Sequence, residues 1–176
     1  MKSFYTLANS LSLFRLVVAP ILAWMILYNR WFAASFLLLL AILSDLFDGR
    51  IARKRKEASP FGGLLDHSCD ALLVAILLFI LNITHGIPLL LPLLVVGSFL
   101  QYVLDSKALS GYKLRTSFLG RSNGIAYYVL ASICIFSEGL GIYIPSTLII
   151  IFSWILIAST LTSMFERLWT LLNKQK

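Results

Sequence analysis

Charged side chains are scarce in this chain of 176 residues. Asp, Glu, Lys and Arg make up 13% of the sequence, about half of the ~25% usual in soluble domains, whereas hydrophobic residues make up 59%. The mean hydropathy is +0.88, and the apolar residues occur in long blocks rather than in alternation. Because so little polar surface cannot cover a globule in water, a water-soluble domain is excluded.

Cysteine is rare as well. Cys69 and Cys134 both lie within apolar blocks, which excludes a disulfide-rich extracellular scaffold. The first apolar block is longer than a signal-peptide core and has no small-residue cleavage site, so we expect it to be retained. The net charge is +7, but no soluble basic domain is present to bind nucleic acid, and we expect no nucleic-acid partner.

The hydropathy pattern predicts an all-α, polytopic integral membrane protein with six transmembrane helices. At ~1.5 Å rise per residue, most of the apolar segments can cross a ~30 Å hydrocarbon core. No internal repeat or linker divides the chain, so residues 1–176 are expected to form a single membrane domain. The predicted spans are residues 10–28, 31–48, 65–83, 87–105, 121–138 and 144–172.

Basic residues are concentrated on one side of these spans. Six spans place both termini together on the side that holds most Lys and Arg, while the opposite side keeps only Arg30. Arg15 is an exception, because it lies about one turn inside the first span. By the positive-inside rule we expect both termini in the cytoplasm, with a bacterial inner membrane as the location.

Four aspartates lie at the cytoplasmic ends of the second and third spans, where isolated charge is costly. Asp45 and Asp48 are three residues apart, and Asp66 and Asp70 are four apart, so each pair faces one direction on a helix. We expect the two helices to be adjacent and antiparallel, with a loop of about sixteen residues that lets the pairs converge. Oxygen ligands suit Mg²⁺, Mn²⁺ or Ca²⁺, and two such ions would bind a diphosphate. The cluster predicts a metal-assisted site for a pyrophosphate substrate.

The segment 45–70 resembles the signature of the CDP-alcohol phosphotransferases of class I, also called CDP-alcohol phosphatidyltransferases. Eight specified residues at fixed spacing rarely recur by chance, and they read Asp45-xx-Asp48-Gly49-xx-Ala52-Arg53-x8-Gly62-xxx-Asp66-xxx-Asp70. A second, shorter segment is similar to the N-terminal segment of the family: Asn9-x-Leu11-Ser12-xx-Arg15-xxxx-Pro20.

The resemblance implies a reaction and a set of site residues. An alcohol hydroxyl would attack the pyrophosphate of a CDP-linked donor, usually CDP-diacylglycerol, to release CMP and form a phosphodiester lipid. Asp45, Asp48 and Asp66 would hold two ions, Mg²⁺ or Mn²⁺, and Asp70 would contact the second ion and act as general base. The donor (CDP) site would be lined by Gly49, Ala52, Arg53 and Gly62. The resemblance also implies a homodimer.

The acceptor alcohol is less well determined by the sequence. Four cations near the fifth and sixth spans either serve topology or bind an anionic acceptor such as glycerol 3-phosphate: Lys113, Arg115, Arg121 and Arg167. Residues 65–71 depart from the Asp-Pro-x-Ala-Asp-Lys pattern of phosphatidylglycerophosphate and cardiolipin synthases. Glycerol 3-phosphate is the expected acceptor, with inositol phosphate, serine, phosphatidylglycerol and aminoalcohols as alternatives.

Two other functional classes make different predictions. An ion-coupled transporter would place its acids near the middle of the membrane, on discontinuous helices with repeat symmetry. An inactive membrane scaffold would not need four costly carboxylates. For His67, which lies about 100° away from the face of its two acidic neighbours, we expect a structural or interfacial role.

Overall fold

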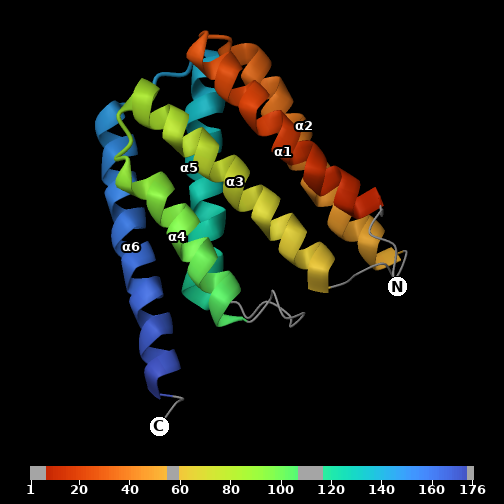
Figure 1. The fold of residues 1–176 in the computed structure, drawn as a ribbon. Coiled ribbons are helices and arrows are strands. Elements are labelled where there is room, and N and C mark those ends of the chain that lie inside the picture. The colour runs from red at the N-terminus through yellow and green to blue at the C-terminus, as the bar shows by residue number, and fades with distance from the viewer. Residues whose placement is uncertain (1–6, 55–59, 107–116, 174–176) are drawn as a thin grey trace.

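The computed structural model is a bundle of six helices, and it describes residues 7–54, 60–106 and 117–173 (Figure 1). All regular structure in these ranges is helical, as predicted, and each expected span coincides with one helix. In chain order the helices are α1 (Leu7–Leu27), α2 (Trp31–Lys54), α3 (Pro60–His85), α4 (Leu90–Asp105), α5 (Phe118–Leu140) and α6 (Ser146–Asn173).

Four of these helices are long and apolar enough to cross a membrane: α1, α3, α5 and α6. The other two contribute shorter apolar stretches, Trp31–Ser44 in α2 and Leu90–Asp105 in α4. Many large apolar side chains face outward, including Phe32, which is 75% exposed, while leucines such as Leu73 and Leu78 are fully buried between helices. An apolar exterior around an apolar core is what lipid surroundings require.

Short turns connect the helices at one end of the bundle. Gly141 ends α5 with a φ of 69°, and the N–H of Ile142 donates to the carbonyl of Ser137 at 2.7 Å. A left-handed residue at this position satisfies the last carbonyls of a helix and stops it. Because the chain runs up and down in this way, the start of α1 and the end of α6 lie at the same end of the bundle (Figure 1).

The connection between α2 and α3 is shorter than the sequence suggested. The expected loop of about sixteen residues is wrong, because α2 continues through Gly49 and Arg53 to Lys54 and α3 begins at Pro60. Hydropathy marks where apolar surface ends, whereas the backbone stays helical through good helix formers such as Ala, Arg and Lys. Proline suits the first position of α3 because its fixed φ is helical and its missing N–H would have no partner there.

The packing order also differs from the expected one. Among the described residues, α1 packs extensively against both α2 and α3, whereas α2 and α3 share at most slight contact. Over the part of the chain whose contacts are described, the second and third helices are therefore not direct neighbours. The side chains of α2 from Asp45 onward, where we expected the two helix ends to meet, lie outside the described residues. Across the interface between α1 and α3, the buried Arg15 side chain of α1 contacts Asp66 and Asp70 of α3.

Helices α2 and α5 approach each other closely at Gly139. A Cβ atom on Gly139 would lie 3.0 Å from the carbonyl oxygen of Trp31 and 3.0 Å from the Cβ atom of Ser35. The Ser35 hydroxyl donates to the carbonyl of Ile135 at 2.9 Å across the same interface. Small residues at such a point let two helix backbones come together.

We predict that Gly139→Ala lowers the thermal unfolding midpoint of the detergent-solubilised protein. The added methyl group forces the two backbones apart, at a cost of about 1–3 kcal/mol. Gly97→Ala is the matched control, because among the described residues only the adjoining backbone of its own helix comes within 4 Å of a Cβ built there. Equal midpoints for Gly139→Ala and the wild type would contradict the close approach.

Candidate active site

Asp66 and Asp70 of α3 face the same side of the helix, as their spacing predicted. Their side chains are about one third exposed, at 31% and 30%. The ring of His67 lies close to them, and one ligand atom from each of the three residues falls within 4.8 Å of the others. His67 is therefore nearer to the carboxylates than its place on the helix suggested.

Arg15 of α1 pairs with both carboxylates. Its Nη2 atom contacts Oδ1 of Asp66 and its Nη1 atom contacts Oδ1 of Asp70. Ser12, one turn earlier, donates to Oδ1 of Asp66 at 3.1 Å and accepts from Nη2 of Arg15 at 3.3 Å. The Arg15 side chain is fully buried, so the charge inside the first span is matched by charge on α3.

Several predicted site residues fall outside the described part of the chain. Lys113 and Arg115 lie in the range 107–116, and only the backbone of α2 is described at Asp45, Asp48, Gly49, Ala52 and Arg53. Gly62 lies in the first turn of α3 and is half-buried. The end of α2 and the beginning of α3 lie at the same end of the bundle (Figure 1). Convergence of all four acids remains a prediction.

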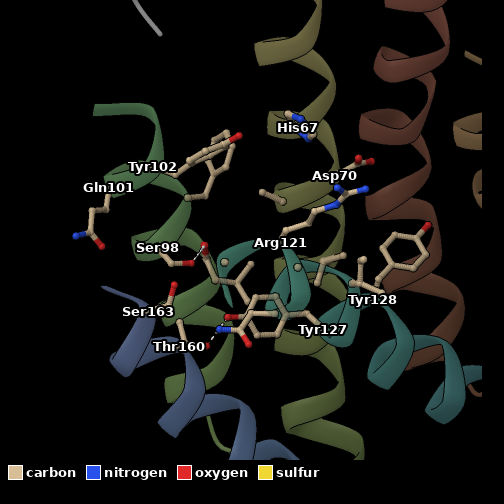
Figure 2. A pocket seen from close by; sticks show the side chains of 18 of the residues that line it. His67, Asp70, Ser98, Gln101, Tyr102, Arg121, Tyr127, Tyr128, Thr160 and Ser163 are labelled. Atoms are coloured by element: carbon tan, nitrogen blue, oxygen red, sulfur yellow. Dashed lines mark hydrogen bonds between the residues drawn. The ribbon is translucent and has the colours of Figure 1, made fainter. Parts of the chain in front are cut away.

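A cavity of about 610 Å³ opens beside Asp70 (Figure 2). Residues of α3, α4, α5 and α6 line it, with Ile42 of α2. On α3 the lining runs from His67 to Val74, in the middle part of the helix. A cavity of this size fits a small organic ligand.

Two of the predicted acceptor cations line this cavity. The Arg121 side chain is exposed and extends toward Asp70 (Figure 2). Arg167 lies 3.7 Å from Asp105, measured from Nη1 to Oδ2, and its guanidinium carbon sits 4.8 Å from the centre of the Tyr102 ring. The structure thus brings Arg121 and Arg167 into the same cavity as Asp70.

The sequence did not single out the neutral polar groups of the cavity. Asn123 is 5% exposed, and its Oδ1 accepts from the Ser159 hydroxyl at 2.7 Å. Its Nδ2 atom and the hydroxyl of Tyr102 are buried without a hydrogen-bond partner among the described residues. Because buried polar groups normally have a partner, these atoms are suited to bind a ligand. The sequence feature that could have pointed to Asn123 is the polar stretch 120–124 at the start of the fifth predicted span.

Curated proteins match parts of this chain. A fission yeast (Schizosaccharomyces pombe) protein named "Cardiolipin synthase (CMP-forming) / mitochondrial hydrolase fusion protein" is 36% identical over 96 residues, covering 54% of this chain and 16% of its own length. A Cereibacter sphaeroides protein named "CDP-diacylglycerol--glycerol-3-phosphate 3-phosphatidyltransferase" is 40% identical over 83 residues, covering 44% and 37%. A chloroplastic rice (Oryza sativa subsp. japonica) protein named for the same activity is 28% identical over 184 aligned positions, covering 92% and 56%.

The match spans less than two thirds of each of these relatives. The family model described as CDP-alcohol phosphatidyltransferase matches residues 5–165, which is most of the chain, and this match establishes the family. That range includes Arg15, the acidic face of α3 and most of the walls of the cavity, whereas Arg167 lies two residues beyond it. This chain belongs to the CDP-alcohol phosphatidyltransferase family.

Proposed function

We propose that this chain is a membrane enzyme that transfers the phosphatidyl group of CDP-diacylglycerol to an alcohol and releases CMP, in phospholipid biosynthesis. The observation that carries the proposal is the cavity lined by Asp70, Arg121 and Arg167. A carboxylate can accept a proton there, and guanidinium groups can hold phosphate oxygens. The names of the relatives support the same chemistry.

We propose Asp66 and Asp70, together with Asp45 and Asp48 of α2, as the ligands of two divalent ions, Mg²⁺ or Mn²⁺. The donor set fits, because ligand atoms of Asp66 and Asp70 lie within 4.8 Å of each other and these ions prefer carboxylate oxygens. When bound, the ions would neutralise negative charge on the diphosphate and on the departing CMP.

In the proposed reaction the acceptor hydroxyl oxygen attacks the phosphorus of the phosphatidyl group, and the bond from that phosphorus to the CMP oxygen breaks. Asp70 accepts the hydroxyl proton on a carboxylate oxygen. The cytidine and phosphates of the donor would lie at the cytoplasmic ends of α2 and α3, along Gly49, Ala52, Arg53 and Gly62.

Glycerol 3-phosphate is the acceptor that we propose. Arg121 and Arg167 line the cavity beside Asp70, and an acceptor with a phosphate group of its own would use these cations, with Lys113 and Arg115 as further contacts. The relatives from Cereibacter sphaeroides and rice are named for this acceptor. Phosphatidylglycerol is the second candidate, since other relatives are named cardiolipin synthases.

The proposed enzyme spans the membrane six times, in a bacterial inner membrane, with its active site and both termini in the cytoplasm, and forms a homodimer. The transporter alternative is disfavoured by the continuity of α3 from Pro60 to His85, and by the position of Asp66 and Asp70 in the first half of that helix. Transporter sites usually lie near the bilayer midplane on broken helices.

We predict that detergent-purified protein releases CMP from CDP-diacylglycerol and glycerol 3-phosphate in the presence of Mn²⁺ or Mg²⁺. Asp70→Asn should lower turnover by at least ~100-fold, because an amide cannot accept the hydroxyl proton, while binding of CDP-diacylglycerol persists. Glu138 lies near the end of α5, where it contacts His85 at the end of α3, and Glu138→Gln is the carboxylate-to-amide control. Unchanged turnover in Asp70→Asn would show that Asp70 is not the general base. Absence of CMP release with every candidate alcohol would refute the proposed enzymatic activity.

We also predict that Arg121→Gln raises the KM for glycerol 3-phosphate by roughly 10- to 100-fold, since a charge-assisted hydrogen bond contributes about 1.5–3 kcal/mol. The KM for CDP-diacylglycerol should stay close to that of the wild type. Arg30→Gln removes an exposed cation from the other end of the bundle and serves as the control. An unchanged KM for glycerol 3-phosphate would show that Arg121 does not bind the acceptor.

A further inference from the structure

We infer that Arg15 is a resident counter-ion of the acidic site, which stabilises the metal-free protein and weakens the binding of divalent cations. The inference rests on the metal site proposed above and concerns a residue on a different helix from the predicted ligands. It makes Arg15 a positioning residue, because the side chain acts through Asp66 and Asp70 rather than on the substrate.

The contacts of Arg15 explain why the two carboxylates can stay together. Asp66 and Asp70 are one turn apart on α3, where two like charges repel each other. The guanidinium bridges them, with Nη2 on Asp66 and Nη1 on Asp70. This fork geometry suits arginine, whose terminal nitrogens can contact two oxygens at once.

Burial of Arg15 strengthens its attraction to the two carboxylates and makes loss of the ion pair costly. The Arg15 side chain has no exposed surface, and an unpaired charge within a membrane helix is costly. Charges interact more strongly where water is excluded. The bundle therefore depends on this ion pair when no metal ion neutralises the two acids.

The same charge opposes an arriving cation. Arg15 compensates one of the two negative charges of Asp66 and Asp70. A divalent ion therefore meets a net charge of −1 from these three groups, whereas the two carboxylates alone would present −2. Arg15 also contacts an oxygen of each carboxylate that the ion would use. Loss of Arg15 should thus weaken the metal-free fold and strengthen metal binding.

The test is the thermal unfolding midpoint of the detergent-purified full chain as a function of Mn²⁺ concentration, for wild type, Arg15→Gln and Arg15→Lys. We expect Arg15→Gln to have a lower midpoint than wild type in EDTA, a larger rise on addition of Mn²⁺, and half-saturation at roughly tenfold lower Mn²⁺. Arg15→Lys keeps the positive charge but cannot contact both carboxylates through a planar fork, so its midpoint and its Mn²⁺ response should lie between those of wild type and Arg15→Gln. Arg30→Gln is the control for loss of a cation and should follow the wild type.

The outcomes separate this inference from the proposed metal site. Equal or weaker Mn²⁺ binding by Arg15→Gln, in a series where wild type responds to Mn²⁺, would overturn the counter-ion role alone. A wild-type midpoint that does not respond to Mn²⁺ would overturn the metal site and this inference together. A purely structural Arg15 would lower the midpoint equally with and without Mn²⁺, which would also overturn the inference.

A second variant keeps the inference testable if Arg15→Gln does not fold. In Arg15→Gln/Asp66→Asn a neutral amide replaces one of the two carboxylates, so the repulsion that Arg15 normally relieves is gone. We expect the double variant to fold and to be purified in EDTA under conditions in which Arg15→Gln is not. A double variant that also fails to fold would contradict the role of Arg15 as a counter-ion.

Discussion

The contact between Arg15 and the carboxylates of Asp66 and Asp70 is the interaction on which the site depends. All three groups lie on helices in a chain with few charged residues, where an unpaired charge is costly. Pairing them joins α1 to α3, and α1 in turn packs against α2. The acidic pair can therefore stay charged within a bundle whose other contacts are mostly apolar.

Asp70 links this ion pair to the cavity. Its carboxylate contacts Arg15 on the α1 side and also lines the space between α3, α4, α5 and α6. Arg121 and Arg167 approach the same space from α5 and α6. A ligand in the cavity would thus meet a carboxylate and two cations, the groups that the proposed transfer to an anionic alcohol would use.

Much of the fold could be predicted because apolar blocks mark helices in lipid. Each of the six expected spans coincides with a helix. The spacing of Asp66 and Asp70 correctly predicted that both side chains face the same side of α3. The partner of Arg15 could not be predicted. Hydropathy places Arg15 inside an apolar span, where a charge needs a partner, but it does not show which helix packs against that side of the span. Nor could Asn123 and Tyr102 be assigned to the cavity, because single polar residues in a span carry no information on the direction they face.

In the proposed enzyme, Asp66 and Asp70 form a divalent-cation site at the edge of this cavity. Anomalous X-ray diffraction from crystals of the full chain grown with Mn²⁺ tests it most directly. We expect an anomalous peak within bonding distance of carboxylate oxygens of both residues. Crystals that bind Mn²⁺ elsewhere, with no peak at these two side chains, would contradict it.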